Sequence, residues 1–361
     1  MECHNCKTEL GPDPKYCKKC GIRLWDPVNN RPDYLINGAY APSASAVEEP
    51  AKIFCRKCKQ ELQAGWKVCP VCAEPAPVFK IAEPAEVPAE EAPAGPQSVI
   101  KTAWIPPGAF SMGSSAWEKG RYDDEGPQRQ VTISRGFWMG VYPVTQEQWE
   151  RVMGKNPSHF KANPAAGEEQ GRRPVESVSW HDALAFANRL SIMEGLEPAY
   201  SVKGKTDPGD WGAAWDAVKI IEGSGGWRLP TEAQWEYAVR AGTAAAFSDG
   251  SQDWEKDAEA IGKTAWLGFN SGGMTHEAGL KQANPWGLHD MHGNVWEWCW
   301  DWHGAYPAQA QTDPAGASSG SARVSRGGSW RYSAQDARSA YRNGVSPSDR
   351  GKSLGLRLLR P

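Results

Sequence analysis

Eight cysteines near the N-terminus have the spacing of metal ligands. They form Cys-x2-Cys pairs, and two pairs separated by ten residues make a unit that occurs twice. The residues are Cys3, Cys6, Cys17 and Cys20 in the first unit and Cys55, Cys58, Cys69 and Cys72 in the second. Each unit can place four thiolates around one ion in the tetrahedral geometry that suits zinc. We therefore predict two structural zinc ions, with disulfides or a redox motif as the alternative.

The segments that carry these cysteines are too short to fold around a hydrophobic core, so the ions would supply the folding energy. They resemble the double zinc ribbon of many bacterial multidomain proteins, which implies a protein partner at the ribbons and no chemistry there. We predict ribbons at residues 1–24 and 53–74, a linker at 25–52, and a Pro/Ala/Glu-rich spacer at 75–98. Basic residues among the cysteines leave nucleic-acid binding as an alternative.

A second stretch that could do chemistry is NPWGLHDMHGNVWEWCWDW, residues 284–302. It is the densest aromatic cluster of the sequence, and Asp290 and Glu297 lie within it. Large aromatic side chains favour burial, and a carboxylate buried among them must be paired, hydrogen-bonded or bound to a cation. The stretch therefore predicts the centre of a large core with a polar or metal feature.

The composition excludes several classes of protein. The chain has 361 residues, a net charge of −3 and a pI near 6.2, with no bias toward nucleic acid or anionic membranes. No run approaches the roughly 18 apolar residues of a membrane span, and the first residues contain no apolar signal region. We predict a cytoplasmic protein without a membrane partner, and nucleic acid is not the favoured partner.

Short helices and strands set in long loops are expected to position these residues. Residues 105–114 have the turn chemistry of a hairpin start, and the alternation over 131–145 predicts a strand. Three helices are predicted by capping boxes and closing glycines. The boxes pair Thr145 with Gln148, Ser179 with Asp182 and Thr231 with Gln234, and the helices end at Gly154, Gly195 and Gly242. This mixture predicts an α+β fold.

Five motifs give the region a family resemblance. In order they are RPVESVSWHDALAFANRL, WRLPTEAQWEYAVRAGT, the aromatic stretch above, RVSRGGSW and LGLRL, and they span most of residues 105–359. Together they resemble the formylglycine-generating enzyme (sulfatase-modifying factor) family. The resemblance implies a C-type lectin-like domain at residues 99–361, behind two small N-terminal zinc ribbons.

The family's chemistry needs residues that this chain lacks. The resemblance implies oxidation of a substrate cysteine by two copper-binding cysteines after the RGGS turn. Tyr332 and Ala337 stand at the matching positions, and neither can replace a thiolate on soft copper. The remaining cysteine, Cys299, is expected in the core as a small hydrophobe. The domain's histidines have no HxD or HExxH spacing. We predict no copper, no catalytic residue and no sulfatase-type oxidation.

The resemblance does imply a structural calcium site. Its ligands would be the side chains of Asp290 and Glu297 and the carbonyls of Gly293 and Val295, since calcium prefers hard oxygen ligands. The alternative for Glu297 is a buried hydrogen bond or salt bridge. A second family site begins near Asn270, where FNSGGMTHEAG is too short to carry its other ligands.

In C-type lectin folds the surface beside the final strands binds ligands, which implies a protein or small-molecule ligand after Ser329. Aromatic residues and arginines with small polar neighbours are typical of such surfaces. The alternative is that Trp330 and Tyr341 pack inward and that Arg338 and Arg342 pair with internal carboxylates. The predicted surface comprises Trp330, Arg331, Tyr332, Ser333, Gln335, Asp336, Arg338, Ser339, Tyr341, Arg342 and Asn343.

The same tail is similar to the variable region of diversity-generating retroelement proteins. We predict a non-catalytic binding protein, potentially one whose tail is diversified at residues 331–333, 343–345 and 351–353. One alternative is an enzyme of the family with altered chemistry. Another is an adaptor that binds nucleic acid or protein through its ribbons.

Overall fold

The computed structural model describes residues 25–26, 31–32, 53–54, 61–62, 98–211 and 215–361. The chain divides into two compact units, residues 1–88 and 89–361. In the first unit, β1 (Trp25–Asp26) pairs antiparallel with β2 (Arg31–Pro32), and β3 (Ile53–Phe54) with β4 (Glu61–Leu62). The eight cysteines predicted to bind zinc lie outside the described residues.

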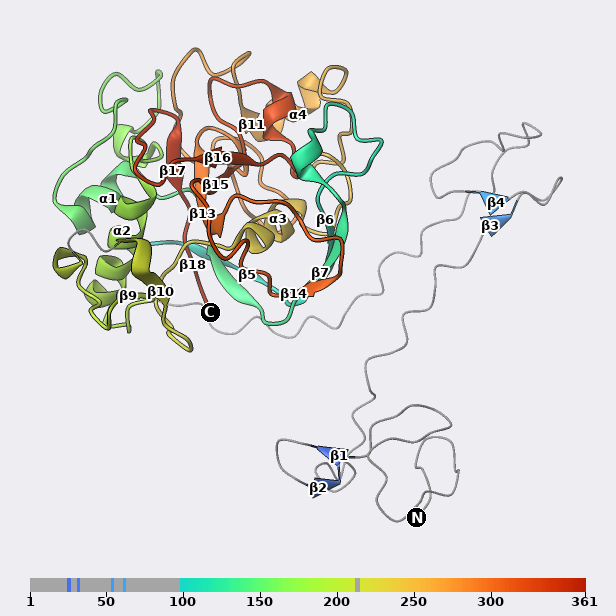
Figure 1. Ribbon diagram of the computed structural model, residues 1–361. Coiled ribbons are helices and arrows are strands. Elements are labelled where there is room, and N and C mark those ends of the chain that lie inside the picture. The colour runs from blue at the N-terminus through green and yellow to red at the C-terminus, as the bar shows by residue number, and fades with distance from the viewer. Residues whose placement is uncertain (1–24, 27–30, 33–52, 55–60, 63–97, 212–214) are drawn as a thin grey trace. The chain divides into compact units, whose positions relative to one another are not determined.

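The aromatic stretch forms the central sheet of the second unit. β13 (Trp296–Trp302) lies between β15 (Arg323–Arg326), which is antiparallel to it, and β17 (Leu354–Leu356), which is parallel. β16 (Asn343–Val345) extends the sheet beyond β15. The two faces of β13 pack against different cores. Trp298 belongs to one hydrophobic cluster, and Cys299 belongs to the other. The predicted aromatic core is therefore confirmed (Figure 1).

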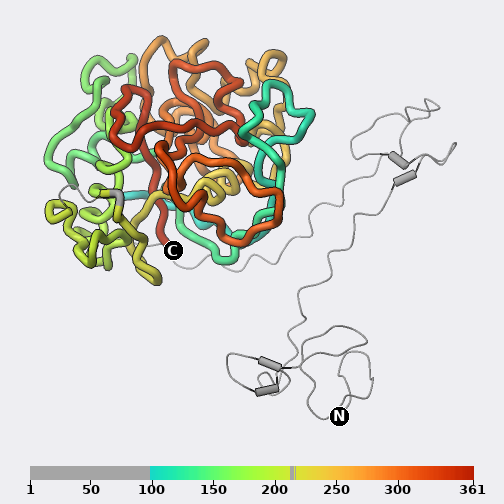
Figure 2. The backbone as a smooth tube through the Cα atoms, in the orientation of Figure 1, coloured from blue at the N-terminus to red at the C-terminus, as the bar shows by residue number. Residues whose placement is uncertain are grey.

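Two three-stranded sheets contain the first strands of this unit. One has the order β14 (Gln311–Thr312), β7 (Arg129–Ile133), β6 (Gly108–Met112). The other has the order β18 (Leu359–Arg360), β8 (Phe137–Gly140), β5 (Thr102–Ile105). Figure 2 shows the C-terminal segment running back to the start of the domain, where β18 joins β8. Two smaller sheets pair β9 (Tyr200–Val202) with β10 (Val218–Ile220), and β11 (Ala265–Trp266) with β12 (His292–Gly293).

The prediction of one strand over residues 131–145 was wrong. β7 and β8 belong to different sheets and are separated by residues 134–136. A Cβ on Gly136 would lie 2.2 Å from the Trp104 ring, so the chain passes too close to that ring for a larger residue. β5 and β6 likewise enter different sheets, so residues 105–114 link two sheets and do not start a hairpin between β5 and β6.

All three predicted helices are present. They are α1 (Gln146–Met153), α2 (Trp180–Met193) and α3 (Glu232–Arg240), and each has its capping box. α1 ends at the left-handed Gly154 as predicted, whereas α2 and α3 end at caps one residue before the predicted glycine, at Glu194 and Ala241. α4 (Ala258–Thr264) was not predicted. The 3-10 turns are η2 (Asp123–Glu125), η3 (Gln170–Arg172), η4 (Pro208–Asp210), η5 (Trp215–Ala217) and η6 (Ala334–Ala337).

The central sheet is packed on both faces. α1 and α2 cover one face, where Trp149, Phe186 and Trp298 share a core, and α3 covers the other through Trp235 (Figure 1). Sheets with helices in an irregular order confirm the α+β prediction. Within the described residues, no helix combines the length and the apolar character that crossing a bilayer would require.

Candidate ligand-binding pocket and buried charge network

A pocket of about 610 Å³ opens where the chain leaves the RGGS turn. This volume is within the range of sites that hold small ligands. Its aromatic lining includes Phe269, which is 56% exposed, and Tyr332, which is 38% exposed. The lining residues are Trp254, Glu255, Ala258, Gly268, Phe269, Arg331, Tyr332, Ser333 and Ala334.

Backbone contacts hold the two loops of this pocket together. The Gly268 N–H donates to the Tyr332 carbonyl at 2.9 Å, and the Ser271 hydroxyl donates to the Trp330 carbonyl at 2.6 Å. A Cβ on Gly268 would come within 3.3 Å of the Tyr332 carbonyl oxygen, so the close approach favours glycine there. The Tyr332 ring meets Trp296 of β13 edge-on at 5.4 Å. The exposed aromatic side chain is thus anchored to the central sheet.

The pocket lining carries one charged side chain of each sign, Glu255 and Arg331. Glu255 is paired with Lys119 at 2.5 Å. The exposed Arg331 guanidinium lies 5.6 Å from the Tyr332 ring centroid and makes no ion pair with any described residue. The pocket therefore offers aromatic faces beside one free guanidinium.

The structure corrects much of the predicted binding surface. Only Arg331, Tyr332 and Ser333 of the eleven residues line this pocket. Gln335, Asp336, Tyr341 and Asn343 are half-buried and lie outside the lining. The other four are buried and cannot contribute an exposed side chain. They are Trp330, Arg338, Ser339 and Arg342.

The alternative interpretation of inward packing and internal ion pairs is correct for Trp330, Arg338 and Arg342. Trp330 packs edge-on against Phe160 and donates its indole N–H to the Lys352 carbonyl. Arg338 pairs with the buried Glu125 and with Glu118 at 2.6 Å. The partners of Trp330 and Arg338 come from segments far away in the sequence. Burial of these two side chains is favourable because their polar atoms are hydrogen-bonded.

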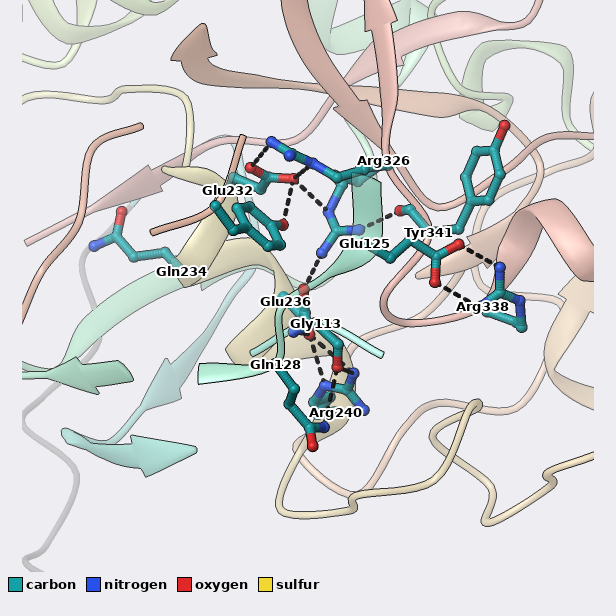
Figure 3. A network of polar contacts seen from close by, with 12 residues as sticks. Gly113, Glu125, Gln128, Glu232, Gln234, Glu236, Arg240, Arg326, Arg338 and Tyr341 are labelled. Atoms are coloured by element: carbon teal, nitrogen blue, oxygen red, sulfur yellow. Dashed lines mark hydrogen bonds and ion pairs between the residues drawn. The ribbon is translucent and has the colours of Figure 1, made fainter. Parts of the chain in front are cut away.

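A network of buried charges fixes the RGGS turn and the tail on α3 (Figure 3). Arg326, the first residue of the turn, forms an ion pair with Glu236 and lies 3.6 Å from Glu232. Glu232 also accepts from Arg342 at 2.7 Å. Burial raises the pKa of Glu232, but the Arg342 and Arg326 guanidinium groups outweigh it and hold that pKa below its usual value. The network therefore keeps Glu232 ionised inside the domain.

Neither position of the family's catalytic cysteines carries a thiol here. The Tyr332 phenol lines the pocket, and Ala337 is fully buried in η6. Burial raises the pKa of the Cys299 thiol well above its ordinary value, so this core residue stays protonated. The part of the chain that the structure describes contains no group of three or more His, Cys, Asp or Glu side chains arranged to hold a metal ion.

The predicted calcium turn shows the alternative arrangement at Glu297. Its carboxylate accepts from Arg357 at 2.7 Å and from the Trp235 indole at 2.7 Å, within the core. A cation at Glu297 would have to share the carboxylate with a guanidinium, so this residue does not fit the role of a free ligand. Asp290 accepts from the Gly279 N–H at 2.7 Å, and burial raises the pKa of its carboxyl group. Calcium at Asp290 and the carbonyls of Gly293 and Val295 stays a prediction.

Sequence reasoning missed the pocket wall opposite Tyr332. Trp254, Ala258 and Phe269 come from α4 and its flanking loops, which carry none of the five motifs. The available signal was Phe269 itself, an aromatic residue directly before the glycine-containing turn at residues 270–273. Nothing in that turn indicated that it would meet the RGGS segment.

The fold and the pocket define a C-type lectin-like domain of the formylglycine-generating enzyme type that lacks the catalytic cysteines. The family model for the sulfatase-modifying factor enzyme 1-like domain matches residues 88–361, and the double zinc ribbon matches residues 3–73. The chain belongs to the sulfatase-modifying factor family and carries a double zinc ribbon ahead of that domain.

Relatives with different names share this domain. The chain is 36% identical to the chaperone protein LppX of Paenibacillus barcinonensis, over 70% of this chain and 86% of that protein. It is 28% identical to the mouse formylglycine-generating enzyme, over 73% and 75%. It is also 32% identical to the serine/threonine-protein kinase pkn1 of Chlamydia pneumoniae, but spans only 40% of that protein.

Solved structures agree with the fold. Treponema denticola variable protein 1 has a TM-score of 0.66 and 39% identity, covering 73% of this chain and 95% of that one. PvdO from Pseudomonas aeruginosa has a TM-score of 0.54 and 28% identity, covering 72% and 93%.

Zinc in the ribbons is testable by metal analysis. The full chain is expected to contain two zinc ions, and replacing both Cys55 and Cys58 by serine should leave one. The thermal transition of residues 98–361 should not move, because the ribbons belong to a separate compact unit. Cys299→Ala is the matched control and should retain both ions. Zinc content that is unchanged in the Cys55/Cys58 variant would contradict the assignment.

Proposed function

We propose that this protein is a non-catalytic binding protein whose ligand occupies the pocket at Arg331–Ser333. The observation that carries the proposal is the replacement of a catalytic cysteine by Tyr332, a half-exposed aromatic residue on a pocket of about 610 Å³. Rigid aromatic side chains beside an arginine are the composition that anchors binding partners. The likeness to Treponema denticola variable protein 1 supports a binding role.

The chemistry of the pocket favours a ligand with an apolar face and a neighbouring acidic group. Phe269, Tyr332 and Trp254 offer ring faces, and the guanidinium of Arg331 has no anionic partner among the described residues. Glu255 is paired with Lys119, which it shares with Asp253. An aromatic or aliphatic side chain next to a carboxylate, as in an acidic peptide segment, would satisfy both features. We keep a cytoplasmic location and a protein partner at the ribbons as part of the proposal.

A phage-displayed peptide library selected on the full chain tests the proposal. Selected peptides should be rich in aromatic and acidic residues and should compete with one another for one site. Tyr332→Ala and Arg331→Glu should each weaken their binding at least tenfold, about 1.4 kcal/mol. Leu280→Ala, which removes a similarly exposed apolar side chain outside the pocket, is the control. Equal loss in the control, or none in either pocket variant, would refute the site.

The enzyme alternative has its own decisive measurement. The protein is loaded with copper and oxygen uptake is followed in the presence of a cysteine-containing peptide. We expect no uptake above the protein-free rate, because no thiol stands at Tyr332 or Ala337. Catalytic turnover would overturn the non-catalytic assignment.

Membership in a diversity-generating retroelement is a finer form of the same proposal. Of the three segments suited to variation, residues 331–333 line the pocket, which is where variation would change ligand choice. The encoding genome should then contain a reverse transcriptase gene and a template repeat near this gene. Their absence would remove this form of the proposal and leave the binding pocket intact.

A further inference from the structure

A second cavity, of about 140 Å³, shares no lining residue with the pocket at Tyr332, and its lining includes exposed residues such as Ala305 and Pro307. It is bounded by the start of α3, the end of β13 and the loop that follows β13. Small and apolar residues such as Met112, Ala233 and Pro314 form much of its wall. Four charged side chains also reach it, namely Arg129, Glu232, Asp301 and Arg342.

Arg129 brings an unbalanced positive charge to this cavity. Its side chain is only 7% exposed, and its Nε and Nη1 atoms are buried without a hydrogen-bond partner. The guanidinium lies 3.7 Å from the ring centroid of Tyr306, and it forms no ion pair with a described residue. Because a buried cation without an anion is costly, the site favours an anionic group beside Arg129.

Asp301 brings the opposite charge to the same cavity. It is buried, and its Oδ2 accepts from the Glu232 N–H at 2.8 Å. Arg342, the other arginine in the lining, is already engaged by Glu232 at 2.7 Å. Burial and the Glu232 carboxylate raise the pKa of Asp301 to about 7, and the Arg342 guanidinium offsets only part of this rise. Among the described residues, no basic group lies within ion-pair distance of Asp301.

These two groups do not pair with each other, so one occupant could satisfy both. We propose that the cavity binds a small α-amino acid, whose carboxylate contacts Arg129 and whose ammonium group contacts Asp301. A lone anion would leave Asp301 unmatched, and a metal cation would leave Arg129 unmatched. A cavity of about 150 Å³ can hold benzene, so the space suits roughly six non-hydrogen atoms, the size of alanine. The apolar wall then faces the short side chain.

Isothermal titration calorimetry with the full chain at pH 8, where Asp301 is ionised, tests the proposal. L-Alanine should bind saturably and raise the melting temperature. Acetate and methylamine, which carry only one of its two charged groups, should bind at least tenfold more weakly. Binding of acetate as tight as that of alanine would show an anion site only and overturn the amino-acid assignment. No binding of alanine at millimolar concentration would overturn it as well.

Two substitutions in the cavity distinguish a ligand-binding role of its charged residues from a purely structural role. Arg129→Met and Asp301→Asn should each reduce alanine affinity at least tenfold. Arg129→Met should also raise the melting temperature of the ligand-free protein, because it removes a buried charge without a partner. Arg135→Met, which changes an exposed arginine outside the cavity, is the matched control and should bind alanine normally. Normal alanine binding by either cavity variant would refute the proposal.

Discussion

Replacing Arg326 by methionine is expected to destabilise the domain by about 3–5 kcal/mol, because two buried acids would each lose a guanidinium partner. Glu236 would keep only Arg240, and Glu232 would keep only Arg342. Arg326 is fully buried and pairs with Glu236, which is also fully buried. It lies near Glu232 as well and donates to the Tyr341 carbonyl (Figure 3). The variant would also free the RGGS turn from α3, so the pocket should lose its ligand together with the stability.

Urea unfolding followed by tryptophan fluorescence measures this loss. Arg350→Met is the matched control, because Arg350 pairs with Asp182 at the surface and should contribute at most about 1 kcal/mol. Adding Glu236→Gln to Arg326→Met should cost less than the sum of the two single variants, because the two side chains interact directly. A loss below about 1 kcal/mol in the single variant would show that Arg240, which also pairs with Glu236, balances this acid without Arg326.

Arg357→Met is expected to have an effect of similar size. The Arg357 guanidinium donates to both oxygens of Glu297 and to the carbonyls of Gly140 and His289, all within the core. Without it, Glu297 keeps only the Trp235 indole as a partner, and the expected loss is again about 3–5 kcal/mol. The double variant with Glu297→Gln should lose less than the sum of the two single variants in urea unfolding. Additive losses would contradict a direct pairing.

The same variant tests the predicted calcium ion. If calcium binds at Asp290 and the neighbouring carbonyls, it should raise the melting temperature of the wild type and raise that of Arg357→Met further, because it supplies positive charge near Glu297. Asp290→Asn should abolish both shifts. A metal analysis that finds no calcium in the folded protein, with no shift on its addition, would show that Arg357 alone balances this turn.

Local signals in the sequence were enough for the helices and for the aromatic core. A capping box is made by residues three apart, so the interactions that start α1, α2 and α3 lie within each segment. The aromatic core around β13 was recognisable because residues 284–302 are the densest aromatic cluster of the sequence. The break between β7 and β8 was not recognisable, because it depends on the contact of Gly136 with Trp104, which lies in another strand.

The binding site was only partly predictable for a similar reason. Arginines such as Arg338 and Arg342 suit both a binding surface and a buried ion pair. Which one they form depends on Glu125 and Glu232, which lie more than a hundred residues away in the chain. Tyr332 was found because it follows the RGGS motif directly. Phe269 was missed because only the folded chain brings residue 268 against residue 332.

The pairing of β18 with β8 has a consequence for biosynthesis. Leu359 lies opposite Met139, and β8 in turn pairs with β5, so this sheet stays incomplete until the last strand has left the ribosome. Closing a loop of that length is slow, and contacts so distant in sequence slow folding in general. Nascent chains would meanwhile expose the tryptophans of β13 without their parallel neighbour β17. The domain should therefore complete its folding only after β18 has been synthesised, and its yield should depend on chaperones that shield apolar segments.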